Sequence, residues 1–273
     1  MRFWLPELPA HYRWFDHVGW WVLRLVGVAV LGFMVLPVLV IVPLSFSDST
    51  FLAYPIEQWS LRWYREMIHA PEWIRAARNS FIVAPAATLI ATALGTLAAT
   101  GLARATYPGK ELITSLVMTP MVVPIVVVAV ATYLSFARFG LTDTYLGLIL
   151  VHAALGAPFV VTTVLATLQN FNTNLVRASL SLGASPLQTF FRVTLPVIAP
   201  GVISGALFAF ATSFDEVVVT LFLAGPEQVT LPRQMFTGIR ENISPTIAAV
   251  ATLLTLFTTA LMLTLEWLRG RSR

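Results

Sequence analysis

The sequence predicts an all-α membrane protein with six transmembrane helices. Of its 273 residues, 57% are hydrophobic and only 11% are charged, whereas about 25% of the residues in an ordinary soluble domain are charged. Six stretches without Asp, Glu, Lys or Arg each reach the roughly 18 to 20 residues that a helix needs to cross a ~30 Å hydrocarbon core. These stretches are residues 25–44, 80–102, 112–137, 144–169, 193–214 and 242–265.

Helices are expected in these stretches because an isolated segment in lipid satisfies its backbone hydrogen bonds only as a helix or within a closed barrel. Barrel strands would alternate apolar and polar residues over about ten positions, and these stretches do not alternate. The first stretch is longer than the apolar core of a typical secretory signal, and no clear small-residue cleavage site follows it. We therefore expect it to be retained.

The basic residues predict which loops face the cytoplasm. With the N-terminus inside, ten of the seventeen Lys and Arg residues fall on the cytoplasmic side, and the short loops and both termini follow the positive-inside rule. We therefore expect both termini to be cytoplasmic. The net charge of +4 then reflects membrane topology and does not indicate nucleic-acid binding.

Two regions border the predicted spans. Residues 1–19 are rich in Trp, Tyr and His, which favour the membrane interface, so we expect a cytoplasmic interfacial segment ahead of a transmembrane domain of residues 20–273. Residues 45–79 form the longest outside connection, and their stretch "SLRWYREMIHA" predicts an amphipathic helix on the outer face that could receive a partner.

Small residues and prolines mark places where the spans pack or bend. Gly201 and Gly205 stand four residues apart, and the second span carries Gly95 and Ala99. This spacing lets two helices approach closely in lipid, either inside the bundle or at a subunit interface. Two prolines in the third span, at positions 120 and 124, predict a kink because proline removes a helical hydrogen bond.

The sequence gives no support to an enzyme. It contains no H-E-x-x-H, G-x-S-x-G or G-x-x-x-x-G-K-[ST] motif, so catalytic and nucleotide-binding residues are not expected. Zero cysteines exclude disulfides and thiolate metal sites. The four histidines are scattered and predict no metal site, and His152 in the fourth span is expected to be a hydrogen-bonded packing residue. Any ATP that the protein uses must be bound by another chain.

Asp215 and Glu216, in "SFDEVVV" at the end of the fifth span, are candidate residues of a translocation path. An ionisable group in a membrane segment costs roughly 3 kcal/mol and usually faces a bundle interior or a water-filled pathway. Consecutive helical residues project about 100° apart, so the two carboxylates share a pocket only if the helix breaks there. We expect one to face the path, where it would attract a cation such as an amine, and the other to cap or bridge the neighbouring backbone. Alternatively, both only stabilise a helix break.

The stretch "RASLSLGASPLQTFFRVTLP", within the cytoplasmic loop of residues 174–196, predicts two short helices joined by a turn. Gly183 is the turn residue that ends the first helix. Ser185 is placed to cap the second, with Pro186 at its first position. Four residues give the second helix an apolar face: Leu187, Phe190, Phe191 and Leu195. Such a face outside the bilayer predicts a groove on a partner protein.

The same stretch resembles the cytoplasmic loop motif of ABC-importer permeases, written E-A-A, three residues, G, nine residues, I-x-L-P. Gly183 stands six residues after Arg177, nine residues follow it, and "VTLP" ends at Pro196. Arg177 replaces the motif Glu, Ser179 the second Ala and Val193 the Ile. The resemblance assigns these residues to ATPase coupling: Arg177, Ala178, Ser179, Gly183, Leu187, Phe190, Phe191, Leu195 and Pro196.

Further segments are similar to the polyamine-type branch of these permeases: "SLRWY", "SFDEVVVTLFLAGP" and "LPRQMF" through "SPTIAAVATLL". The resemblance covers most of the chain from residue 20 onward. It implies a type I ABC importer permease fold with cytoplasmic coupling helices, in the bacterial inner membrane.

The partners that the resemblance implies are a second permease subunit in a heterodimer, two ATP-binding subunits that hold the ATP and magnesium, and an extracytoplasmic solute-binding protein. ATP-driven closure of the ATPases would then switch the permease between inward-open and outward-open states. The solute would be a small cationic amine or polyamine, with selectivity residing largely in the binding protein.

Two other functions stay open on the sequence alone. An ion-coupled carrier or channel would also explain carboxylates within the membrane, although the internal repeats of many secondary carriers are missing. A membrane scaffold without transport activity is the third possibility.

Overall fold

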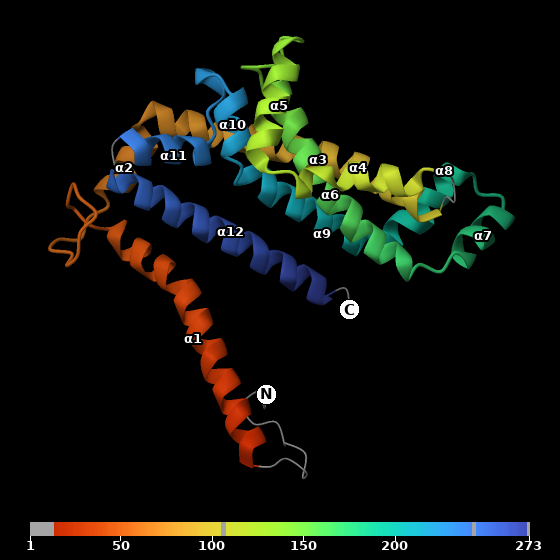
Figure 1. Cartoon of the computed structure of the whole chain (residues 1–273), viewed down its shortest axis with the longest axis horizontal. Helices are drawn as coiled ribbons and strands as arrows, with labels where there is room; N and C mark the ends of the chain where they lie inside the picture. The colour runs from red at the N-terminus through yellow and green to blue at the C-terminus, as the bar shows by residue number, and fades with distance from the viewer. Residues whose placement is uncertain (1–13, 105–107, 242–243, 272–273) are drawn as a thin grey trace. The chain divides into compact units, whose positions relative to one another are not determined.

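The computed structural model describes residues 14–104, 108–241 and 244–271, and the regular structure in these residues is helical (Figure 1). The elements are α1 (Trp14–Leu44), α2 (Arg62–His69), α3 (Pro71–Arg104), α4 (Lys110–Val122), α5 (Ile125–Ala137), α6 (Tyr145–Gln169), α7 (Asn174–Ser181), α8 (Pro186–Thr189), the π-helical η1 (Phe190–Thr194), α9 (Leu195–Phe214), α10 (Val218–Leu223), the 3-10 turn η2 (Pro226–Gln228), α11 (Leu231–Glu241) and α12 (Pro245–Arg271).

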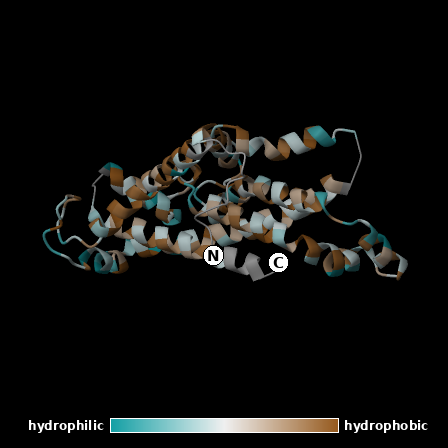
Figure 2. Cartoon of the chain, turned by 90° about the horizontal axis from the view of Figure 1, so that it is seen from below, coloured by the Kyte–Doolittle hydropathy of each residue, from teal (hydrophilic) through white to brown (hydrophobic). Residues whose placement is uncertain are grey.

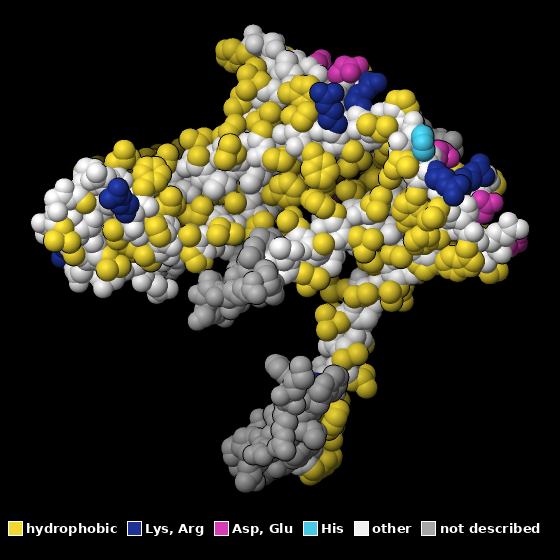
Figure 3. All heavy atoms as spheres, turned by 180° about the vertical axis from the view of Figure 1, so that it is seen from behind, with side chains coloured by type: hydrophobic (Ala, Val, Ile, Leu, Met, Phe, Trp, Pro, Cys, Tyr) yellow, Lys and Arg dark blue, Asp and Glu magenta, His cyan; other side chains and the backbone are white. Residues whose placement is uncertain are grey.

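Five helical segments of the described chain are long and apolar enough to cross a membrane. They are Val18–Leu44, Pro71–Ala103, Tyr145–Gln169, Pro186–Phe214 and Pro245–Thr264. Figure 2 shows hydrophobic residues along the helices, whereas many hydrophilic residues lie in the connections. Hydrophobic side chains also cover much of the described surface in Figure 3, as lipid contact requires.

The third predicted span, residues 112–137, is not one straight helix. It consists of α4 and α5, which meet at an angle of 107°, so the described chain has six spans only if this bent pair counts as one. The break lies at the second of the two prolines that predicted a kink. Val123 is extended with a ψ of 134°, and Pro124 is the N-cap of α5. A residue before proline is driven out of the helical region. Pro120, by contrast, lies inside α4 without ending it.

The chain divides into two compact units. The first comprises the residues up to Tyr64 together with Ser244–Leu256, and the second comprises Arg65–Ile243 with the residues from Phe257 onward. In the first unit, the Trp63 indole donates a hydrogen bond to the Ser47 carbonyl over 2.8 Å, and the Ser45 and Tyr64 hydroxyls are 2.7 Å apart. These contacts fix the start of α2 against the end of α1.

The amphipathic helix predicted after the first span is confirmed as α2. Trp63 is buried, whereas Arg62, Arg65 and Glu66 are exposed. The predicted interfacial segment of residues 1–19 falls largely outside the described residues. Of its residues, Trp14 to Gly19 already belong to α1, so helical structure begins before the predicted boundary.

The second unit is built around α3, α6 and α9, which pack at places where side chains are very small. A Cβ atom added to Gly205 would lie 2.5 Å from Thr163 Oγ1 and 2.7 Å from Val160 Cα. One added to Gly95 would lie 2.7 Å from Val160 Cβ, and Ala99 is fully buried. The predicted small-residue stripes thus pack inside the bundle, where close contact stabilises helix association in lipid.

Buried hydrogen bonds attach the connection between α10 and α11 to this three-helix core. The buried Asn79 amide donates hydrogen bonds to the carbonyls of Glu227 and Val229, each over 2.8 Å, and accepts one from the Tyr145 hydroxyl over 2.7 Å. The Leu231 N–H donates to Ser80 Oγ. Burying these polar groups is tolerable because each has a partner, so the connection that follows α10 is held against α3.

We expect Gly205→Ala to lower the thermal stability of the purified protein. The added methyl meets the backbone of α6 at Val160, which cannot rotate away as a flexible side chain can, and overpacking of this kind costs roughly 1 to 3 kcal/mol. The matched control is Gly101→Ala in α3, where a Cβ meets nothing within 4 Å and alanine favours the helix. Equal melting temperatures for the two variants would contradict the packing.

Candidate functional site

The first candidate site is the segment between α6 and α9, where α7 and α8 are joined by a turn (Figure 1). The predicted first helix is confirmed; it begins at Asn174 and has Leu182 as its C-cap. Gly183 has a φ of 84°. Its N–H donates to the Leu180 carbonyl over 3.0 Å, and the Ala184 N–H donates to the Ser179 carbonyl over 3.2 Å. This is the Schellman arrangement, which glycine adopts without steric strain.

The second helix of the segment begins with a complete capping box. The predicted N-cap Ser185 accepts a hydrogen bond from the Gln188 N–H over 3.3 Å, and the Gln188 side chain accepts one from the Ser185 N–H over 2.9 Å. Pro186 occupies the first helical position, as predicted. The partner Gln188 was not predicted, although the pattern S-x-x-Q in the sequence is its signal.

A hydroxyl pair fixes the angle between the two short helices. Ser179 Oγ and Thr189 Oγ1 are 3.0 Å apart, and Thr189 is only 2% exposed. Ser179 was predicted as a site residue from its place in the loop motif, whereas Thr189 was not. Sequence spacing could not indicate this contact, because the two residues belong to different helices.

The predicted contact face is only partly open. Leu187 and Phe191 are exposed, whereas Phe190 and Leu195 are half-buried, and Leu195 packs on the core of the second unit. Leu182, which was not assigned to this face, is 89% exposed. The remaining motif residues Arg177, Ala178 and Pro196 are exposed. The segment thus presents apolar and basic side chains together.

A π-helical turn joins the segment directly to α9. The Leu195 N–H donates to the Phe190 carbonyl, five residues earlier. Pro196, the next residue, has no N–H to offer the carbonyl four residues before it, so the α-helical ladder is interrupted here in any case. Turns of this kind often occur at functional sites. The segment is therefore continuous with α9, with no loop between α8, η1 and α9.

The second candidate site is the break at the other end of α9. That helix ends at Phe214, Asp215 is its C-cap, and α10 begins at Val218. Glu216 Oε1 accepts a hydrogen bond from the Val219 N–H over 2.8 Å, whereas Asp215 is exposed. The helix breaks here, as the alternative hypothesis assumed, and the expected capping role of one carboxylate is confirmed for Glu216.

Two further groups surround this break. His152 of α6 is buried and lies 2.8 Å from Ser213 Oγ through Nδ1 and 3.2 Å from Thr220 Oγ1 through Nε2, which confirms the expected hydrogen-bonded packing residue. On another side, four phenylalanine rings pack together with neighbouring centroids 5.2 to 6.3 Å apart. They are Phe81, Phe210, Phe214 and Phe257.

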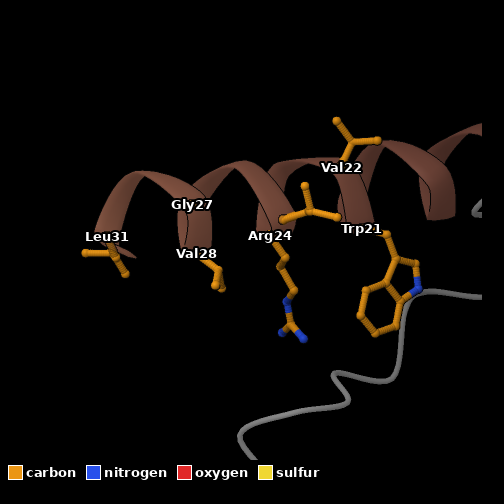
Figure 4. A pocket seen from close by; sticks show the side chains of 7 residues that line it. Trp21, Val22, Arg24, Gly27, Val28 and Leu31 are labelled. Carbon is orange, nitrogen blue, oxygen red and sulfur yellow. The ribbon is translucent and has the colours of Figure 1, made fainter. Parts of the chain in front are cut away.

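Neither candidate site coincides with the pocket shown in Figure 4. That pocket lies along α1 and is lined by Trp21, Val22, Arg24, Leu25, Gly27, Val28 and Leu31. Arg24 stacks over the Trp20 ring, 3.5 Å from its centroid. The lining is almost wholly apolar and contains no predicted site residue. Among the described residues, no group of three His, Asp or Glu could hold a metal ion.

Comparisons with known proteins agree on one class, the membrane components of transport systems. The family model for the inner membrane component of binding-protein-dependent transport systems matches residues 91–272. The putrescine transport system permease protein PotI of Escherichia coli K12 is 32% identical over 236 residues, covering 83% of this chain and 84% of the relative. The spermidine/putrescine transport system permease protein PotC of the same organism is 28% identical over 226 residues, covering 83% and 85%.

A solved structure shares the fold. A chain of a bacterial ABC transporter involved in the import of the acidic polysaccharide alginate matches with a TM-score of 0.76, covering 93% of this chain and 98% of that one. Only 14% of the residues are identical, so this likeness concerns the fold alone.

Proposed function

Because the chain belongs to the family of binding-protein-dependent transport system inner membrane components, we propose that it forms half of the translocation path for a small cationic amine. It is a permease component of an ABC importer in the bacterial inner membrane, with the type I permease fold, and a transport subunit rather than an enzyme. Family membership favours this function over an ion-coupled carrier, a channel or a scaffold.

The observation that carries the coupling role is the geometry of α7 and α8. The turn at Gly183, the capping box and the hydroxyl pair make a rigid projection with exposed Leu187 and Phe191. An apolar helical face of this kind fits a groove on a partner. We place an ATP-binding subunit on this face, with ATP and magnesium held by that subunit. Its movement would reach the membrane through the continuous run of α8, η1 and α9.

The amine substrate is supported by two independent points. The relatives named for putrescine and spermidine are similar to this chain over more than four fifths of its length. In addition, Asp215 is exposed at a helix break and its carboxylate is not the group that caps α10. A carboxylate at such a place attracts a cation.

The assembly that we propose contains a second, different permease subunit, two ATP-binding subunits and an extracytoplasmic solute-binding protein that delivers the amine. A solved alginate transporter complex contains a periplasmic binding protein, and this chain belongs to a binding-protein-dependent family. We further propose that both termini are cytoplasmic, which places the segment of α7 and α8 in the compartment that contains ATP.

We expect Gly183→Val to uncouple ATP hydrolysis from uptake in the reconstituted complex while the subunits still assemble. A branched residue in the left-handed region is strained by roughly 1 to 2 kcal/mol, so the turn opens and α8 is displaced. Uptake of labelled putrescine and ATP hydrolysis are measured together.

The matched control for this variant is Gly140→Val. Gly140 has a φ of 65° and open space around it, so the strain is similar, but it lies between α5 and α6. Uptake that is reduced equally in both variants, or unchanged in Gly183→Val, would argue against the coupling role of the turn.

We also expect Asp215→Asn to raise the KM for putrescine roughly ten- to a hundredfold, because a charge-assisted hydrogen bond contributes about 1.5 to 3 kcal/mol. Glu216→Gln is the control, since a glutamine oxygen can still accept from the Val219 N–H, and its KM should change much less. The reverse order of effects would show that Glu216, and not Asp215, meets the substrate.

A further inference from the structure

We propose that His152 is a positioning residue of the transport path, which fixes the break between α9 and α10 and so sets where Asp215 is presented. This inference rests on the proposed function for its link to transport. His152 belongs to α6, Ser213 to the last turn of α9 and Thr220 to α10. One imidazole ring therefore joins three helices, and its two contacts lie on either side of the broken segment.

The hydrogen bonds in this cluster form one connected chain. The Thr220 hydroxyl donates to the Glu216 carbonyl over 3.3 Å, and its oxygen lies 3.2 Å from His152 Nε2. A neutral imidazole donates through one nitrogen and accepts through the other, and a hydroxyl such as that of Ser213 serves in either role. Both ring nitrogens are therefore paired. A continuous chain of bonds then runs from the end of α9, through the ring, to the backbone of the residue beside Asp215.

Burial makes this chain of bonds difficult to replace. His152 is 1% exposed, Ser213 is 5% and Thr220 is 0%, and the adjacent positions Val151 and Val219 belong to a buried apolar core. A buried polar group that loses its partner costs free energy that no solvent contact returns. A different geometry of the break would leave ring nitrogens or hydroxyls unpaired, so the cluster selects one geometry.

A packing residue alone would not need this chemistry. An apolar side chain of similar volume would fill the same space without bridging α9 and α10. The polar ring connects the two helices at positions on either side of Asp215 and Glu216, while the Leu223 carbonyl at the far end of α10 accepts a hydrogen bond from the Asp143 N–H over 2.9 Å. The short helix is thereby held at both ends.

The test uses the full complex in proteoliposomes, with variants that remove one or both contacts. His152→Leu removes both, Ser213→Ala and Thr220→Val remove one each, and His152→Gln can restore the bond to Thr220. We expect a KM for putrescine raised roughly tenfold in His152→Leu and less in each single-contact variant, with maximal uptake nearly unchanged and partial recovery in His152→Gln. In combination with His152→Leu, Ser213→Ala and Thr220→Val should add little, because they break the same connection.

The matched control for the threonine variant is Thr252→Val. Thr252 is also buried, at 2% exposure, but its hydroxyl donates to the Ala248 carbonyl of its own helix, so its KM should be unchanged. An equal KM change in Thr252→Val and Thr220→Val would reduce the effect to the loss of a buried hydroxyl and overturn the proposal.

A second measurement does not depend on transport. The chain has no cysteine, so Val217→Cys, within the break, can report its exposure to a membrane-impermeant thiol reagent. We expect several-fold faster labelling in His152→Leu, Ser213→Ala and Thr220→Val, a rate in His152→Gln below that of His152→Leu, and a rate near that of the parent in Thr252→Val. If labelling is the same in all variants, His152 does not fix the break.

The two measurements separate the two hypotheses. A parent complex that takes up no putrescine contradicts the proposed substrate, while the labelling rates still test the role of His152. If His152→Leu does not assemble, Ser213→Ala and Thr220→Val carry the test, and normal KM and labelling in both would overturn the positioning role.

Discussion

The close approach of α6 to α3 and α9 is the constraint on which the second unit depends. Val160 of α6 packs so closely against Gly95 and Gly205 that a Cβ atom added to either glycine would clash with it. In lipid, where helices gain little from hydrophobic burial, such contact is a main source of association. The three helices therefore form a rigid frame, and the segments that carry function are attached to its ends.

The helix α9 connects both candidate sites within this frame. At its beginning it continues from α8 through the π-helical turn, and at its end it breaks at Asp215. A helix of 20 residues is about 30 Å long, close to the thickness of a hydrocarbon core. A shift of the segment of α7 and α8 can thus be transmitted along one helix to the Asp215 carboxylate at its other end. The turn at Gly183 precedes the beginning of this continuous run, and the hydrogen bonds of His152 hold its end.

Much of this arrangement could be predicted from local patterns. Uncharged length indicated the spans, and the turn at Gly183 and the cap at Ser185 follow from conformational preferences of single residues. The 107° angle between α4 and α5 exceeds what two prolines indicate, because tertiary packing sets the angle. The contacts of Thr189 and of His152 join residues from different helices, so sequence spacing alone could not reveal them. The half-burial of Phe190 and Leu195 could not be predicted either, because it depends on how the chain around the start of α9 packs on the core.

We propose that this chain transports a cationic amine when partner ATPases act on the segment of α7 and α8. The most direct test is ATP hydrolysis and putrescine uptake by the complete complex in proteoliposomes, with the binding protein either empty or loaded with putrescine. We expect loaded binding protein to raise hydrolysis several-fold and uptake to rise with it. Hydrolysis that is indifferent to the loaded binding protein, with no uptake above the empty control, would contradict it.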